Sequence, residues 1–146
     1  MHPQEPVFLG PAQQVTLIVG LNRGKTAGLP AHCSLQPLMY EREYVDEVFV
    51  RLRALQVGIP HVEASRVDAR GWYQGMPEGS ILYEVLYLPG SVESETSWEQ
   101  FLDHMGHLAE QLRFHLCQDS VLLIADDGQH RQTYLVEARA NIPPVR

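Results

Sequence analysis

The stretch SETSWEQFLDHMGHLAEQLRFHL, residues 94–116, gives the clearest structural signal in the chain. It opens on a capping box, in which Thr96 or Ser97 is followed three residues later by Glu99 or Gln100. Apolar residues then recur at helical spacing, namely Trp98, Phe101, Leu102, Met105, Leu108, Leu112 and Leu116. We therefore expect an amphipathic helix, and the segments around it must supply the surface that its apolar face covers.

Extended runs on both sides of this helix supply that surface. Before it, residues 61–75 and 79–90 predict two strands that are joined through the segment GMPEG as a hairpin. After it, residues 120–138 predict two more strands around an Asp-Asp-Gly turn. Nearer the N-terminus, residues 14–21 predict a strand, and residues 41–56 predict a helix with Val45, Val48, Phe49, Leu52 and Leu55 on one face.

The order β-α-β-β-α-β-β predicts an α+β, ferredoxin-like fold, with one antiparallel sheet and both helices on one face. We expect a single domain over residues 1–146, with an extended arm at 1–13, a core at 14–138 and a tail at 139–146. Strand 79–90 is apolar on both faces, because Tyr83, Val85 and Tyr87 alternate with Leu82, Leu86 and Leu88. We therefore expect the uncovered face to meet another copy of the chain in a dimer or larger homo-oligomer.

Composition and charge narrow the function classes. The net charge of −7 and only 11 Lys and Arg residues argue against binding to duplex nucleic acid, which needs a continuous basic patch. No apolar run is long enough to span a membrane, which predicts a soluble protein. Cys33 and Cys117 have no CxxC spacing and no secretory leader precedes them, so we expect reduced thiols and a cytoplasmic location.

The segment VGLNRGKT, residues 19–26, is one residue short of a phosphate-binding P-loop. Only three residues separate its two glycines, and Gly28, Pro30 and Pro37 oppose the helix that a P-loop must open. We expect an irregular loop that places Asn22 and Arg23 at its rim, near the strand at residues 61–75. Such a loop either binds an anion through Arg23 and Lys25 or is merely solvated.

The segment SRVDARGWYQG carries Arg66 and Arg70 next to Trp72 and Tyr73. Guanidinium groups clamp phosphates and aromatic faces stack on bases, so these residues suit a nucleotide-like ligand. The alternative is that Trp72 belongs to the core and that the arginines face solvent.

The sequence contains no local signature of a catalytic nucleophile, such as G-x-S-x-G. His104, His107 and His115 share the predicted helix at residues 94–116, but no further metal ligand is identifiable, so we treat them as surface histidines. Asp126 and Asp127 are typical of a turn. We therefore expect no catalytic residues, no metal and no cofactor.

Several short motifs together resemble a known group of proteins. The pattern GLNRG, a helix, GWYQG with a following E.S, then F…M..LAE.L and Q.SV, is similar to small phage proteins of the Thoeris anti-defence sponge type. It also resembles a bacterial family with no assigned function, and the likeness spans residues 15–136. The resemblance implies an oligomer that sequesters a cyclic ADP-ribose-type signal without cleaving it. It adds Arg113 and Arg131 to Asn22, Arg23, Arg66 and Trp72 as residues of the right type.

From these observations we expect a non-catalytic binder of a small phosphate-bearing cyclic nucleotide, which blocks host defence in the host-cell cytoplasm if a phage encodes it. Two alternatives stay open. One is a protein-interaction module that inhibits a host protein, and the other is a small histidine-dependent enzyme.

Overall fold

The computed structural model describes residues 5–6, 8, 10–25, 29–56, 64–73, 76–87 and 96–138, with Trp72, Tyr73, Met76 and Pro77 described by their backbone alone. Its elements are β1 (Gln13–Gly20), the 3-10 helix η1 (Ala31–Leu35), α1 (Arg42–Ala54), β2 (Ala64–Tyr73), β3 (Met76–Tyr87), α2 (Trp98–His115), β4 (Ser120–Asp126) and β5 (Arg131–Glu137). The expected tail at 139–146 lies outside the described residues, and so do residues 1–4, 7 and 9 of the expected arm.

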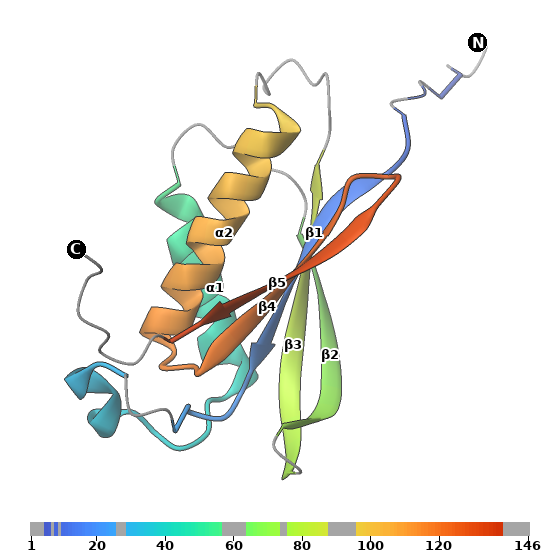
Figure 1. The fold of residues 1–146 in the computed structure, drawn as a ribbon. Helices are drawn as coiled ribbons and strands as arrows, with labels where there is room; N and C mark the ends of the chain where they lie inside the picture. The colour runs from blue at the N-terminus through green and yellow to red at the C-terminus, as the bar shows by residue number, and fades with distance from the viewer. Residues whose placement is uncertain are drawn as a thin grey trace, which may run out of the picture.

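The five strands form one antiparallel sheet in the order β2-β3-β1-β4-β5. Both helices lie on the same face of this sheet (Figure 1). The first four strands have the order of the ferredoxin-like plan, and β5 is the added strand, so the predicted fold class is confirmed.

The core lies between the helices and the sheet. Leu17 of β1, Tyr83 of β3 and Leu123 of β4 point to this side and are almost fully buried. Phe49 of α1 stacks on Tyr83 with ring centroids 3.8 Å apart, and Phe101 of α2 is completely buried. The apolar stripes of both helices therefore cover one face of the sheet.

The ends of α2 place two segments that matter for the site. Ser97 is the N-cap and forms the capping box with Gln100, which selects one of the two pairs that the sequence allowed. Cys117 has a φ of 50° directly after the helix and turns the chain toward Gln118 and Asp119. The backbone N–H of Gln118 donates to the carbonyl of Arg113 at 2.9 Å.

The hairpin between β2 and β3 is tighter than the sequence indicated. The segment GMPEG was expected to form the connection, but β3 already begins at Met76 and Gly71 pairs with Glu78. Strand pairing continues through residues 76–79 in place of the expected turn, because these residues gain cross-strand hydrogen bonds by extending the ladder. As a result, Glu78 stands on a strand and not in a flexible turn.

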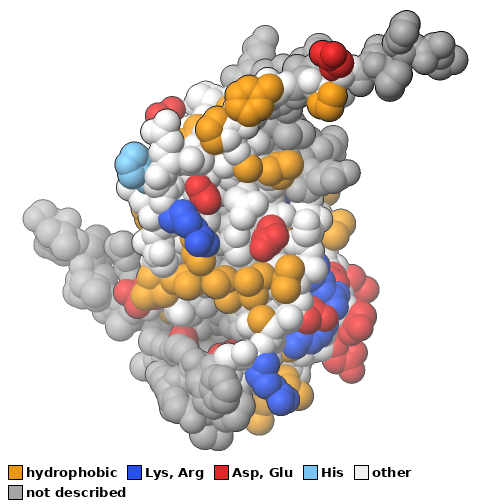
Figure 2. Space-filling view, turned by 90° about the vertical axis from the view of Figure 1, so that its right-hand side faces the viewer, with side chains coloured by type: hydrophobic (Ala, Val, Ile, Leu, Met, Phe, Trp, Pro, Cys, Tyr) orange, Lys and Arg blue, Asp and Glu red, His pale blue; other side chains and the backbone are white. Residues whose placement is uncertain are grey.

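The face of the sheet away from the helices is partly apolar. Val67, Leu82, Ile18, Leu122 and Leu135 are register partners, one on each strand, and they form a continuous row that we call the apolar band (Figure 2). Val67 and Leu135 are exposed, at 44% and 57%. Within the described ranges, neither helix has the length and apolar character that crossing a bilayer requires.

Candidate functional site

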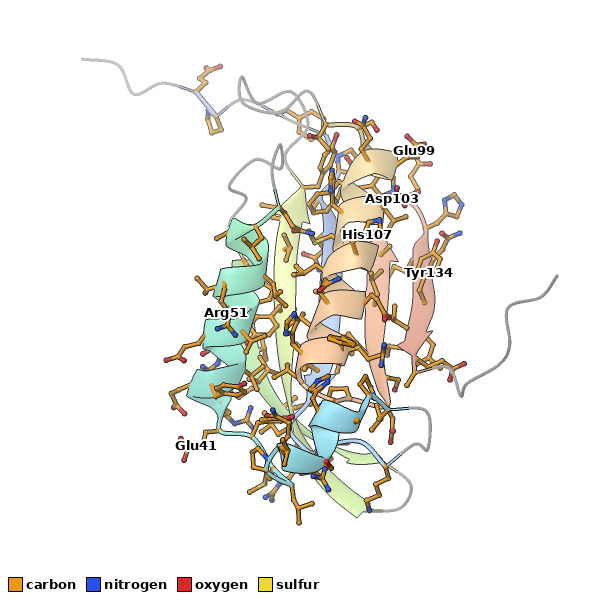
Figure 3. The ribbon with its side chains drawn as sticks, turned by 90° about the vertical axis from the view of Figure 1, so that its left-hand side faces the viewer. Glu41, Arg51, Glu99, Asp103, His107 and Tyr134 are labelled. Carbon is orange, nitrogen blue, oxygen red and sulfur yellow. A yellow bond between two sulfur atoms is a disulfide. The ribbon has the colours of Figure 1, made fainter. Side chains whose placement is uncertain are left out.

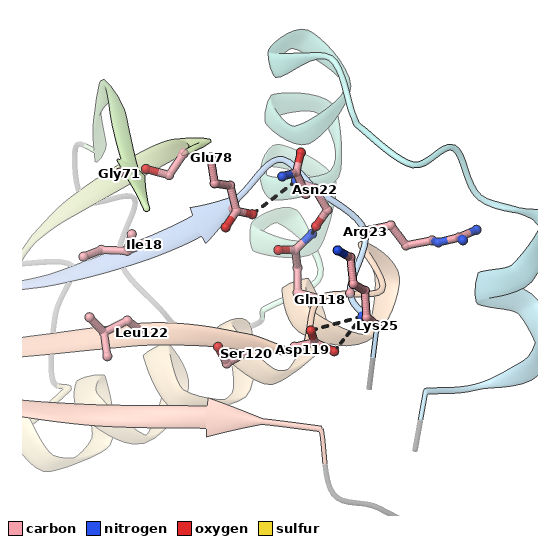
Figure 4. A pocket seen from close by; sticks show the side chains of 13 residues that line it. Ile18, Asn22, Arg23, Lys25, Gly71, Glu78, Gln118, Asp119, Ser120 and Leu122 are labelled. Atoms are coloured by element: carbon pink, nitrogen blue, oxygen red, sulfur yellow. Dashed lines mark hydrogen bonds between the residues drawn. The ribbon is translucent and has the colours of Figure 1, made fainter. Parts of the chain in front are cut away.

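A pocket of about 380 Å³ opens on the same face of the sheet as the apolar band, at the end where β1 leaves the sheet. Its walls come from β1 to β4, from the loop at residues 21–25 and from the turn after α2 (Figure 4). Its volume is in the range of small-molecule sites. Because four strands and two connections converge here, residues far apart in the sequence share one cavity.

The loop at residues 21–25 is irregular, as expected, and it is not a P-loop. Its backbone N–H groups are already bonded within the protein: Asn22 donates to Glu78 Oε1, Arg23 to the Leu38 carbonyl, Gly24 to the Cys117 carbonyl and Lys25 to both carboxylate oxygens of Asp119. A P-loop works by offering such N–H groups to a phosphate. This loop therefore acts as a fixed wall.

Glu78 is one of the two acidic residues that line the pocket, the other being Asp119. Its Oε1 accepts the Asn22 N–H at 3.3 Å, and burial followed by the nearby Asp119 charge raises its pKa above the ordinary value. Gly20 makes room for it, since a Cβ at that position would overlap the Glu78 carboxylate and lie 3.0 Å from Gln118 Oε1. The glycine that ends β1 thus lets a carboxylate fold into the cavity.

Gln118 and Asp119 hold the loop against the turn after α2. The Gln118 amide donates to the carbonyls of Asn22 at 2.9 Å and of Leu116 at 3.2 Å. Asp119 accepts the Lys25 N–H at 3.0 and 3.1 Å. These two buried polar side chains therefore fix the shape of the pocket.

The two cations at the rim differ in their orientation. Arg23 Nη1 donates to the carbonyls of Cys33 at 3.1 Å and Gln36 at 2.9 Å, and its side chain points away from the cavity toward η1 (Figure 4). Lys25 is exposed at the mouth. The pocket interior is thus more acidic than the surrounding loop.

The wall that the sheet contributes includes an apolar patch. Ile18 and Leu122 belong to both this wall and the apolar band, and Ser80 and Ser120 lie beside them. A Cβ at Gly71 would meet no atom of the described residues within 4 Å, so among them the cavity is open above this position. An apolar patch beside small hydroxyl groups suits the ring of a nucleobase.

The structure does not bring the eight predicted ligand residues together. Asn22 and Arg23 line the pocket, whereas strand alternation puts Arg66 and Arg70 on the helix side of β2, opposite Tyr83 and Gly79. The guanidinium of Arg66 is occupied by Asp46 of α1 and by Asp68, which is 2.9 Å away. The side chains of Trp72 and Tyr73 lie outside the described residues.

Arg113 and Arg131 are also away from the pocket. Arg113 is buried in the last turn of α2, where it pairs with Glu110 at 2.6 Å. Arg131 begins β5 opposite Asp126, which is six residues along β4 from the pocket residue Ser120, or about 20 Å at the usual strand rise. One pocket therefore cannot use all of the predicted arginines.

Sequence reasoning missed the residues that define the cavity. Glu78 sits in a segment that looked like a turn, and Gln118 and Asp119 follow the helix with no motif of their own. The expected free thiols were also wrong, because Cys33 and Cys117 form a disulfide across 84 residues. Their Cα atoms are 5.6 Å apart only because the end of α2 packs against η1.

Comparison with known proteins gives two solved structures of the same fold. A phage SAM lyase in its apo state matches with a TM-score of 0.71 and 26% identity, covering 93% of this chain and 98% of that chain. A phage SAM lyase in complex with S-methyl-5'-thioadenosine matches with a TM-score of 0.68 and 24% identity, covering 94% and 97%. No protein-family model and no curated protein sequence matches the chain.

These matches correct the functional expectation. The chain is similar to phage proteins, as its motifs indicated, but the matches do not support a likeness to the Thoeris sponges specifically. The prediction of a non-catalytic protein that sequesters a cyclic nucleotide is wrong, because both matched structures are lyases. One of them holds a small nucleoside, S-methyl-5'-thioadenosine, which is consistent with the expectation of a small-molecule ligand.

Proposed function

We propose that this chain is a lyase that cleaves S-adenosylmethionine (SAM) and releases S-methyl-5'-thioadenosine. The observation that carries the proposal is the match to a phage SAM lyase over nearly the full length of both chains. A cytoplasmic location and a role against host defence remain predictions.

The charges of the pocket support this substrate. SAM has a sulfonium cation, an ammonium group, a carboxylate and an adenine ring. The Glu78 carboxylate lies inside the cavity, where it can pair with a cationic part of the substrate. Lys25 stands at the mouth, within the same lining, where a carboxylate can meet it. The wall formed by Ile18 and Leu122 suits the adenine.

The bond changes of the proposed reaction follow from its products, because a lyase releases methylthioadenosine without adding water. The bond between the sulfonium sulfur and Cγ breaks, and its electron pair goes to sulfur, which leaves as a neutral thioether. The substrate carboxylate supplies the new pair by closing on Cγ, so the remaining fragment becomes a five-membered lactone and no proton is lost. Ring closure within one bound molecule gains from high effective molarity. The alternative, removal of a Cβ proton, needs a strong base because that proton is not activated.

Glu78 and the pocket walls then serve to bind and position the substrate. A carboxylate beside the sulfonium fixes the sulfur, and the apolar side chains of Ile18 and Leu122 pack against the ligand. Gln118 and Asp119 keep the loop in place while the ligand enters. In this mechanism the substrate carboxylate is the nucleophile, and the protein only binds and positions the substrate. This agrees with the absence of a nucleophile motif in the sequence.

Incubation of the purified chain with SAM, followed by mass spectrometry of the products, tests the proposal. We expect methylthioadenosine and the lactone in equal amounts. Glu78→Gln should lower kcat/KM by about tenfold to hundredfold, the worth of a hydrogen bond to a charged group. Glu84→Gln is the matched control, because Glu84 is on the same strand and the same face but outside the pocket lining. Intact SAM, or an equal loss in both variants, would contradict the proposal.

We further propose that a second copy of the chain covers the apolar band. The band crosses all five strands and its two ends are exposed, which is unfavourable for a surface in water. Because Ile18 and Leu122 also line the pocket, a subunit on the band would shield the cavity from solvent. Sedimentation should show a dimer or larger species, and Val67→Lys with Leu135→Lys should dissociate it. A wild-type monomer at micromolar concentration would contradict this.

A further inference from the structure

A second chemical cluster lies apart from the substrate pocket, where η1 meets the C-terminal end of α2 (Figure 3). It consists of the Cys33–Cys117 disulfide and the imidazole of His32. His32 Nε2 is 3.7 Å from Cys33 Sγ and 3.6 Å from Cys117 Sγ. Both cysteines are buried and the histidine is exposed, so the cluster has one side open to solvent.

These distances match a zinc coordination shell. Tetrahedral Zn²⁺ binds thiolate sulfur at about 2.3 Å and imidazole nitrogen at about 2.0–2.1 Å, which separates a sulfur from a nitrogen ligand by about 3.5 Å. Two of the three ligand-to-ligand edges therefore already have the required length. The third edge joins the two sulfurs, and it can open to about 3.8 Å once the disulfide is reduced.

The backbone that carries the cluster is held in place without the disulfide. Arg23 donates to the carbonyls of Cys33 and Gln36, which ties η1 to the loop at residues 21–25. The N–H of Gly24 in the same loop donates to the carbonyl of Cys117 at 2.7 Å. These contacts tie the backbones of both cysteines to the same loop independently of the disulfide. The His32 ring also packs against Phe114, with centroids 5.0 Å apart.

We propose that the reduced chain binds one Zn²⁺ through Cys33, Cys117 and His32, with a water molecule in the fourth position. A thiol or phosphine reductant supplies two electrons to the disulfide, which takes up two protons and becomes two thiols. Zinc then displaces both protons and forms two sulfur–metal bonds and one nitrogen–metal bond. The disulfide and the metal site are mutually exclusive states of the same three residues. This inference does not depend on the reaction proposed for the pocket.

Titration of the full-length chain with Co²⁺ and then Zn²⁺ tests the site. The protein is first reduced with a phosphine, and circular dichroism records whether its helix content persists. We expect a thiolate-to-cobalt charge-transfer absorption that saturates at one Co²⁺ per chain and disappears when Zn²⁺ is added. The oxidised chain should bind neither ion at this site.

His32→Gln should weaken zinc binding at least about tenfold, because it removes one of three protein ligands while both thiols remain. His107→Gln is the matched control, since His107 is an exposed histidine on α2 outside the cluster. Three results would overturn the proposal: a folded reduced chain that binds no metal, a His32→Gln variant that binds as tightly as wild type, or a chain that loses its fold on reduction. The last result counts because the site requires the backbone contacts to hold the cluster together.

Discussion

The two faces of the sheet are built by the same strands but have different roles, because one packs against the helices and the other forms the pocket. On the helix side, Leu17, Tyr83 and Leu123 are almost fully buried, and the Tyr83 hydroxyl donates to Asp46 at 2.6 Å. One residue away on the other side, Ile18 and Leu122 are only partly buried and line the pocket. A step of one residue along a strand therefore separates a position that stabilises the fold from one that lines the pocket.

The largest difference between the faces should appear in stability. Leu123→Ala should lower the free energy of unfolding by about 2–5 kcal/mol, because it leaves a cavity in the core. Leu122→Ala, on the adjacent residue, should cost about 1 kcal/mol or less, since its side chain is already in partial contact with water. Urea denaturation of both variants, with unchanged m-values, checks this. Equal losses of unfolding free energy in the two variants would contradict the difference in burial between the two faces.

A pair of glycines should separate stability from activity within the pocket. A Cβ at Gly24 would lie 2.6 Å from the backbone nitrogen of Asp119, so Gly24→Ala should destabilise the protein by about 1–3 kcal/mol. A Cβ at Gly20 would overlap the Glu78 carboxylate, which is the end of a flexible side chain, so Gly20→Ala should fold normally and lose turnover of SAM. Thermal melts and product assays on both variants measure the two effects. A fully active Gly20→Ala protein would show that the placement of Glu78 is not required.

Filling the cavity should affect substrate binding alone. Gly71 is opposite Glu78 in the register and has open space above it, so Gly71→Val should raise KM for SAM about tenfold. The same change should alter stability by no more than about 0.5 kcal/mol, because a Cβ at this position meets none of the described residues within 4 Å. Steady-state kinetics and a melting curve give the two values. An unchanged KM would place the substrate elsewhere.

The pH dependence should show the smallest effect and can be assigned to one group. Burial, and then the Asp119 charge, raise the pKa of Glu78 above its ordinary value of 4.5. If the ionised carboxylate binds the substrate, kcat/KM should fall as the pH drops below this raised pKa, and Glu78→Gln should remove that limb of the profile. Stability has the opposite sign: folded Glu78 holds its proton more tightly than in the unfolded chain. Raising the pH from 4.5 through the native pKa should therefore lower stability.

The fold could be predicted because its signals repeat along the chain. Alternation in β3 and the helical spacing of α2 each extend over several residues that face the same core. The capping box even allowed Ser97 as the N-cap of the helix, which the structure confirms. The hairpin was misplaced, because Gly and Pro in GMPEG indicated a turn where the ladder continues, and the short helix η1 was not predicted.

The pocket could be predicted only in part, because its residues meet through pairing that no local pattern reveals. Asn22 and Arg23 were identified from their place at a strand end, and they do line the cavity. Arg66 and Arg70 have suitable chemistry, but the register of β2 puts them on the helix side. Glu78 comes to the cavity through the pairing of β3 with β1, which depends on contacts across more than 50 residues.

The central claim, that the pocket on the open face binds the nucleoside part of the substrate, is tested most directly by titrating the ¹⁵N-labelled chain with S-methyl-5'-thioadenosine. The account predicts that the largest amide shifts occur at Gly20, Gly71 and Glu78, with little change at Arg66 on the helix side of the same strands. No saturable shifts, or shifts that centre on the helix side, would contradict it.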